Sequence, residues 1–233
     1  NLKKSNDDQV WMEISDNATI TTSGWNWACG EIRNPKGIIC YDGTAYDGEN
    51  PKEPIDPTST HYDASNAAHV MTYKVKQSWL TYLANVTAIT NATTKSEIGA
   101  FLNVDDYVDD LLVSAVICHT DNWCNNMLNA TWDNQHWSAL MYDMDMIFGI
   151  AWHITDPGYG VDKSPTYDER THKAFSYCPW LQKFQTIFWD DIKARYAELR
   201  DCVIFSVENI IGLLEAFTRE VGDDVYKDDV KRW

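Results

Sequence analysis

Four polar side chains between residues 121 and 145 have the types and the spacing needed for chemistry on a phosphate. Asp121 and Asn126 lie in one polar stretch, and Asp143 and Asp145 follow in an acidic stretch further along the chain. Phosphoryl transfer needs a carboxylate that orients or deprotonates a hydroxyl, and carboxylate and amide oxygens that hold Mg²⁺ against phosphates. Asp121 is a candidate for the first role, and Asn126 and Asp143 are candidates for the second.

The stretch that precedes Asp121 predicts a buried helix. Its apolar residues recur at helical spacing, which gives one broad apolar face. Asn103 or Asp105 could cap its start, because a short polar side chain can accept a hydrogen bond from the first free backbone N–H groups. The pattern stops beyond Cys118, so Asp121 and Asn126 are expected on a loop. The apolar face consists of Val104, Tyr107, Val108, Leu111, Leu112, Ala115 and Val116.

A hairpin is predicted between the polar loop and the acidic stretch. Residues 127–132 and 136–142 read as two short strands, and Asp133-Asn134 between them is a turn-prone pair. Such a hairpin would bring Asp143 back beside the loop. Protein kinases use the same order, an Asp and an Asn in the catalytic loop and then an Asp before Phe-Gly. Here the second motif reads Asp-x-Asp-x-x-Phe-Gly.

At these residues the chain resembles the CotH family, the spore-coat-type atypical kinases. That family has a long helix, a loop Asp with a downstream Asn, two short strands and then a Trp-Asp-x-Asp-x-x-Phe-Gly type motif. The resemblance implies that Asp121 is the catalytic-loop Asp, and that Asn126 and Asp143 bind Mg²⁺ together with ATP. It also places Asp145 near the metal as a further acidic group.

Two positions leave the correspondence open. Tyr142 stands where the family often has Trp. Asn125 remains an alternative to Asn126, because one sequence does not settle a shift of one residue. The resemblance covers roughly residues 66–233 and implies an α+β, protein-kinase-like fold. In that fold a mostly helical C-terminal lobe carries a short catalytic β-hairpin, and a small β-rich segment precedes it.

The rest of the chain fits two parts, residues 1–65 and residues 66–233. The first part is rich in loops and short strands and is expected to be the remnant of an N-terminal lobe. The second part carries helical patterns, with Ser65 or Asn66, Thr94 and Ser206 as candidate N-caps and Gly222 as a helix end. Expected strands cover residues 10–14, 18–22, 25–32 and 37–41, and expected helices cover residues 66–88, 94–102, 180–200 and 206–222. The last helix has an apolar stripe, Val207, Ile210, Ile211, Leu214 and Phe217, that we expect to face inward.

The composition limits the partners. The formal net charge of −16 argues against nucleic acid and against an anionic membrane, because a basic surface supplies most of the affinity for both. No run approaches the roughly 20 apolar residues that would span a bilayer. The six cysteines include no Cys-x-x-Cys pair, so a zinc site is poorly supported. A hydrophobic content of 44% provides for a sizeable core.

Two functions are therefore expected. The first is an atypical kinase that transfers phosphate from Mg-ATP to a protein hydroxyl. The chain begins at Asn1 and shows neither a Gly-rich strand nor a strand Lys before residue 66, so this enzyme would need a longer protein. The alternative is a non-catalytic structural or adhesion module that binds partner subunits of an extracytoplasmic surface assembly, such as a spore coat, a secreted appendage or a phage virion or tail.

Overall fold

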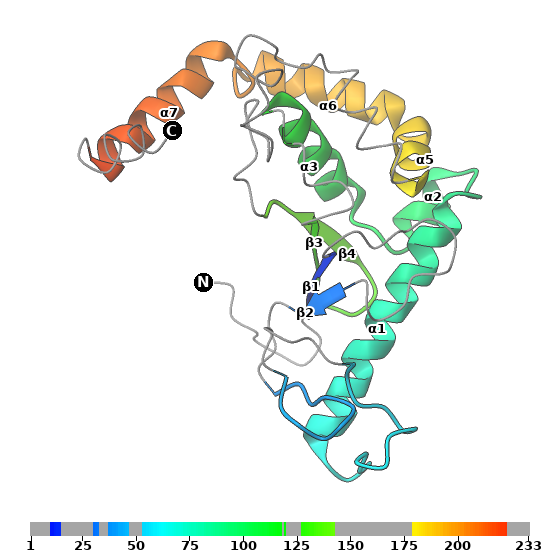
Figure 1. Cartoon of the computed structure of the whole chain (residues 1–233). Helices are drawn as coiled ribbons and strands as arrows, with labels where there is room; N and C mark the ends of the chain where they lie inside the picture. The colour runs from blue at the N-terminus through cyan, green and yellow to red at the C-terminus, as the bar shows by residue number, and fades with distance from the viewer. Residues whose placement is uncertain are drawn as a thin grey trace, which may run out of the picture. The chain divides into compact units, whose positions relative to one another are not determined.

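The computed structural model describes residues 10–14, 30–32, 37–46, 53–117, 119, 127–142 and 179–222 (Figure 1). The chain divides into two compact units, residues 1–189 and residues 190–233. Among the described residues, the first unit holds a small sheet and four helices, and the second holds two helices.

An antiparallel sheet lies at the centre of the first unit. Its strands are β1 (Val10–Ile14), β2 (Gly30–Ile32), β3 (Met127–Thr131) and β4 (Trp137–Leu140), in the order β2-β1-β3-β4. β3 and β4 form the predicted hairpin, with boundaries within two residues of those expected. Its turn includes Asn134 at a φ of 59°, a left-handed conformation that Asn tolerates better than most residues. All five residues of β3 are buried.

The helices of the first unit begin close to where their capping signals predict. α1 (Ala67–Ile89) starts after Asn66, whose side chain accepts from the Ala68 N–H. α2 (Lys95–Gly99) starts with a complete capping box between Thr94 and Glu97, and it ends three residues before the predicted limit. The other helices described in this unit are α3 (Val104–Val116) and α5 (Pro179–Ile187).

Aromatic side chains fill the space between α1, α3 and the sheet. Trp79 stacks on Tyr82 with ring centroids 5.0 Å apart, and Trp137 lies 4.8 Å from the Tyr82 ring and 5.7 Å from Trp79. All three side chains are buried. The predicted apolar face of α3 also points inward, since Tyr107, Leu111 and their apolar neighbours on that face are mostly buried.

Residues 37–41 do not form the strand that the sequence predicts. The chain makes only isolated bridges there, Ile39 to Ala45 and Cys40 to Pro54. The physical reason is a tight reversal: the Cys40 N–H donates to the Thr44 carbonyl at 2.7 Å, and Gly43 adopts a φ of +83°. A Cβ at Gly43 would also lie only 3.2 Å from the His61 ring. The reversal leaves too few residues in line for a strand.

The second unit contains α7 (Val207–Val221) and all of α6 (Trp189–Asp201) except its first residue. The single helix expected over residues 180–200 is thus two helices, α5 and α6. α7 begins and ends as predicted: the Ser206 hydroxyl accepts from the Asn209 N–H at 3.0 Å, and Gly222 follows with a φ of 89°. Both caps depend only on residues close to the helix ends, so the sequence alone could predict them.

The inward apolar stripe predicted for α7 is wrong for the part of the chain that the structure describes. Four of its five members are exposed: Val207, Ile211, Leu214 and Phe217. An amphipathic pattern reports that a helix has an apolar face, and it does not report what covers that face.

The mixture of helices with one small antiparallel sheet confirms the α+β class. The kinase-like arrangement stays a prediction, and so does the boundary between residues 65 and 66. β1 and β2, from the first 65 residues, pair in one sheet with the hairpin of residues 127–140. Among the helices described here, none is long and apolar enough to cross a membrane.

Candidate functional site

The residues proposed to do the chemistry lie outside the described residues. Asp121, Asn126, Asp143 and Asp145 all fall in the gaps of the structure, as does Asn125. Their predicted roles in catalysis and Mg²⁺ binding therefore stay predictions. What the structure does describe is the framework to which they are attached.

Three points of the chain border the two stretches that carry these residues. His119 follows α3, is buried, and its backbone N–H donates to the Ser114 carbonyl at 2.8 Å. Met127 begins β3 and is also buried. Tyr142 follows β4 and packs against the cluster of Trp11, Leu128 and Ala130. Each stretch therefore begins or ends at a residue that the core holds.

The hairpin register brings two of these points together. Leu128 pairs with Leu140 and Thr131 pairs with Trp137. The hairpin turn is at the Thr131 end, so Met127 and Met141 lie next to one another at the open end. Asn126 is the residue before Met127, and Asp143 follows Tyr142. Successive Cα atoms are about 3.8 Å apart, so both residues are attached within a few ångströms of the same end.

The packing of α3 on β4 determines where the third point, His119 at the end of α3, lies. Leu102, just before α3, forms a parallel bridge with Trp137 at the start of β4. The Asn103 N–H donates to the Trp137 carbonyl at 2.8 Å, and the Trp137 N–H donates to the Phe101 carbonyl at 2.9 Å. α3 then packs against β4. Helix and strand start together and run toward the same side (Figure 1).

The lengths of the two elements agree with this convergence. The 13 residues of α3 rise about 20 Å at 1.5 Å per residue. The chain from Trp137 to Tyr142 spans at most about 20 Å. The end of α3 and the open end of the hairpin therefore lie at similar distances from their common start.

Asn103 occupies a helix N-cap position, but its side chain does not cap the helix. It occupies the N-cap position of α3, as predicted, but its side chain makes no capping hydrogen bond. Instead its Nδ2 donates to Ser138 Oγ at 2.7 Å. The side chain thus ties the start of α3 to β4, because a partner on a distant strand competes with the local backbone for the same amide.

A second polar contact in the core is made by uncharged groups. Tyr82 of α1 and Tyr107 of α3 each place their hydroxyl 2.8 Å from Oδ1 of Asn129 in β3. Burial, together with the neighbouring Tyr82, raises the pKa of Tyr107 well above its ordinary value. The hydroxyl therefore stays protonated and can donate. Sequence reasoning missed this contact, since its members are far apart in the chain.

The hairpin turn is held by a carboxylate. Asp133 accepts from the backbone N–H groups of Gln135 and His136, both at 2.8 Å, and its Oδ2 lies 2.8 Å from His136 Nδ1. Partial burial raises the pKa of Asp133, but the hydrogen bonds from His136, Gln135 and Thr131 outweigh it and hold that pKa well below its usual range. Asp133 is therefore a turn residue that stays ionised.

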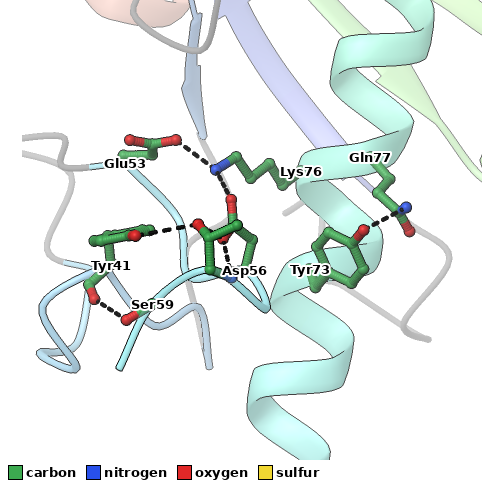
Figure 2. Close-up of polar contacts among 8 residues, drawn as sticks. Tyr41, Glu53, Asp56, Ser59, Tyr73, Lys76 and Gln77 are labelled. Carbon is green, nitrogen blue, oxygen red and sulfur yellow. Dashed lines mark hydrogen bonds and ion pairs between the residues drawn. The ribbon is translucent and has the colours of Figure 1, made fainter. Parts of the chain in front are cut away.

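A buried lysine on α1 was also missed. Lys76 Nζ contacts Glu53 Oε1 at 2.5 Å and Asp56 Oδ2 at 2.6 Å (Figure 2). Both carboxylates come from the loop that leads to α1, and the Tyr41 ring lies 6.0 Å from the ammonium. The signal was available: Lys76 falls among the buried positions of α1, which include Thr72, Val75 and Trp79. A lysine in such a stripe needs acidic partners.

Lys76 is not a free phosphate ligand, because two carboxylates already surround it. The lysines before residue 66 all lie outside the described residues. Within the described ranges, no group of three or more His, Cys, Asp or Glu side chains is arranged to hold a metal ion.

Comparison with known proteins gives one result. The chain matches the CotH kinase protein family over residues 32–233, from the last residue of β2 onward. No curated protein and no solved structure matches it. The family match starts earlier than the resemblance seen in the sequence, which began near residue 66. Since the match spans most of the chain, the protein belongs to the CotH kinase protein family, and that membership suggests a kinase-like function.

Proposed function

We propose that this chain transfers the γ-phosphoryl group of Mg-ATP to a hydroxyl of a protein substrate, as part of a longer protein. Asp121 orients the acceptor hydroxyl and takes its proton, while the bond from the γ-phosphorus to ADP breaks and a new bond to the acceptor oxygen forms. Asn126 and Asp143 hold Mg²⁺, and Asp145 adds negative charge nearby. These groups are the ones that phosphoryl transfer requires.

One observation carries the proposal. The end of α3 and the open end of the β3–β4 hairpin lie on the same side of the first unit, and the stretches that bear the four candidate residues start from those ends. Asn126 and Asp143 come from different stretches and must meet within a few ångströms to share one metal ion, with Asp121 close to both. Convergence of their attachment points is the arrangement that such a meeting requires.

The charge of the chain is compatible with ATP under one condition. With a formal net charge of −16, the protein repels free nucleotide phosphates. A bound divalent cation removes that repulsion locally, so binding should depend strongly on Mg²⁺. The same charge argues against nucleic acid as the substrate.

The test is a calorimetric titration of the full-length protein with ATP, with and without Mg²⁺. We expect binding that needs Mg²⁺ and that is abolished by Asp143→Ala, together with loss of phosphate transfer to protein. Asp105→Ala is the matched control, because Asp105 is an exposed carboxylate in the first turn of α3. It should bind Mg-ATP like the unaltered protein.

Two results would count against the proposal. If Asp143→Ala leaves the transfer rate unchanged, Asp143 takes no part in the mechanism. If the unaltered protein binds no Mg-ATP but binds a glycan or a partner protein, the chain is a kinase-like structural or adhesion module instead.

A further inference from the structure

α7 presents a broad apolar face to solvent. With 3.6 residues per turn, the large apolar residues of this helix fall on one side of it. Among the described residues, five of them are 47–65% exposed: Val207, Ile211, Leu213, Leu214 and Phe217. Val203 and Ile204, in the turn just before the helix, are exposed as well. The face thus has the character of a buried surface without the burial.

α7 does not have the sequence of a helix that is stable by itself. Its 15 residues are a length at which isolated helices are marginal in water even with favourable residues. It contains Gly212, around which a Cβ would meet open space, and the β-branched Val207, Ile210 and Ile211. Glycine and β-branched residues lower helix propensity. The helix therefore depends on packing of its apolar face, which supplies most of the stability of helices in proteins.

The charged residues of α7 lie away from the centre of this face. Glu215 and Arg219 form an ion pair at 3.7 Å on the opposite side, and Glu208 falls on that side too. A partner on the apolar face therefore buries no charge at its centre. The helix carries three Glu and one Arg, whereas helices that lie on a membrane surface carry mainly Lys and Arg on their polar face. The charge pattern favours a protein surface over a lipid surface.

The exposed apolar area matches what each copy in a stable dimer buries. A Val, Leu, Ile or Phe side chain carries on the order of 100 Å² of apolar surface. Seven such side chains, each about half to two thirds exposed, therefore present roughly 400 Å² to solvent. Each partner of a standard complex buries roughly 800 Å², of which somewhat more than half is apolar. The face is thus large enough to form the apolar centre of one side of such an interface.

The face also has a hollow into which a side chain of a second helix could insert. Ile211, Leu214 and Thr218 line this hollow together with Glu215 and Arg219. In packed helix pairs, a side chain of one helix inserts into a hole formed by about four residues of the other. α7 thus offers both the projecting apolar side chains and a hole to receive them.

We propose that the apolar face of α7 is a surface for self-association, which packs against the same face of a second copy of the chain. A twofold contact needs one patch that complements itself, and an apolar face with its charges on the far side meets that condition. Two 15-residue helices packed side by side share about 22 Å of contact length. This inference goes beyond the proposed function and does not depend on it.

The experiment compares Leu214→Glu with Ala216→Glu in the full-length protein. Leu214 lies at the centre of the apolar face, whereas Ala216 is exposed on the opposite side of the same helix, so the two variants add the same charge to different faces. Sedimentation equilibrium over a wide range of protein concentrations gives the dissociation constant of the dimer. Amide hydrogen exchange of residues 207–221 is followed over the same range. A reductant is present throughout, because the exposed Cys202 could otherwise link two copies.

The unaltered protein should form a dimer, and exchange in α7 should slow as the concentration rises. Leu214→Glu should raise the dissociation constant at least about a hundredfold, because a twofold dimer loses the leucine from both copies. Ala216→Glu should leave it unchanged. Phe217→Ala is a second variant in case Leu214→Glu does not fold. Phe217 is 65% exposed, so the fold of one copy does not need it, and its loss should weaken the dimer at least about tenfold.

Three results would overturn the inference. If the unaltered protein is a monomer whose α7 exchanges slowly at every concentration, the rest of its own chain covers the face. If it is a monomer whose α7 exchanges quickly, nothing covers the face. If a dimer forms and persists unchanged in Leu214→Glu and Phe217→Ala, the two copies meet through another surface. None of these results bears on binding of Mg-ATP, so the proposed function is tested separately.

Discussion

Two of the buried polar residues of α1, Tyr82 and Lys76, have different surroundings. Tyr82 joins an uncharged cluster with Tyr107 and Asn129, in which each side chain is at most 2% exposed. Lys76 joins a charged cluster with Asp56 and Glu53 (Figure 2). The side chain of Lys76 is 6% exposed, that of Asp56 16% and that of Glu53 52%. We call these the neutral cluster and the charged cluster.

The difference follows from the cost of removing each kind of group from water. An ion loses far more hydration free energy than a hydroxyl or an amide does, so it stays near solvent even when it is paired. The charged cluster accordingly lies where a loop covers α1. The neutral cluster lies among Trp79, Trp137 and the sheet, where a charge would be strongly unfavourable.

The two clusters also join different things. The charged cluster attaches residues 53–56 to α1, a connection near the surface. The neutral cluster connects α1, α3 and β3 in the core. Loss of the neutral cluster should therefore be the more damaging to stability.

Asn129→Ala gives the largest effect that we predict for stability. It removes the acceptor of two buried hydroxyls and leaves a cavity, so the free energy of unfolding should fall by roughly 3 kcal/mol or more. Urea denaturation, monitored by circular dichroism, measures this free energy of unfolding. Asn91→Ala is the control, because Asn91 is an exposed Asn just after α1, and its change should be within about 0.5 kcal/mol. A loss below about 1 kcal/mol for Asn129→Ala would mean that the hydroxyls of Tyr82 and Tyr107 can form a hydrogen bond with each other in place of those to Asn129.

Features with a local cause were predictable from the sequence. The N-caps Asn66, Thr94 and Ser206 accept hydrogen bonds from backbone groups two or three residues away. The Asp133-Asn134 turn likewise depends on contacts within the hairpin. Such signals need only a few neighbouring residues, so one sequence suffices to read them.

Features that depend on distant partners were not predictable. Asn103 sits at a helix start like any cap, yet its amide bonds to Ser138. Nothing near Asn129 indicates that Tyr82 and Tyr107 converge on it. The order of Asp121, Asn126 and Asp143 pointed to a family that the comparison then confirmed. The geometry of those three residues stays a prediction, because they lie outside the described residues.

Lys76→Met tests the charged cluster and should have the second largest effect. Met keeps most of the length and the apolar contacts of Lys and removes the charge. Asp56 and Glu53 can then turn to water, so the loss of unfolding free energy should be about 2 kcal/mol, between the values for exposed and for fully buried pairs. Lys74→Met is the control, since Lys74 is exposed on the same helix. A loss as large as that of Asn129→Ala would show that hydration does not distinguish the two clusters.

The pH dependence of the charged cluster is the smallest effect and the most direct measure of its charge. Partial burial raises the pKa of Asp56, but hydrogen bonds from Lys76 and Thr58 outweigh it and lower that pKa from 3.8 to about 2. A carboxyl whose pKa is lower in the folded state stabilises the fold fully above its unfolded value of 3.8, and that contribution is lost as the pH falls through 2. At neutral pH the contribution is complete.

The carboxyl carbon shift of Asp56, followed by NMR from about pH 1 to pH 6, should therefore show a midpoint near 2 in the unaltered protein. In Lys76→Met the midpoint should move up toward 3.8, because the hydrogen bond and the charge of the ammonium are both gone. The Thr58 hydrogen bonds remain and should keep it somewhat below that value. A midpoint that is the same in both proteins would mean that Lys76 does not stabilise the ionised Asp56. The charged cluster would then be held by packing and not by electrostatic attraction. The two clusters would then differ only in how deeply their side chains are buried.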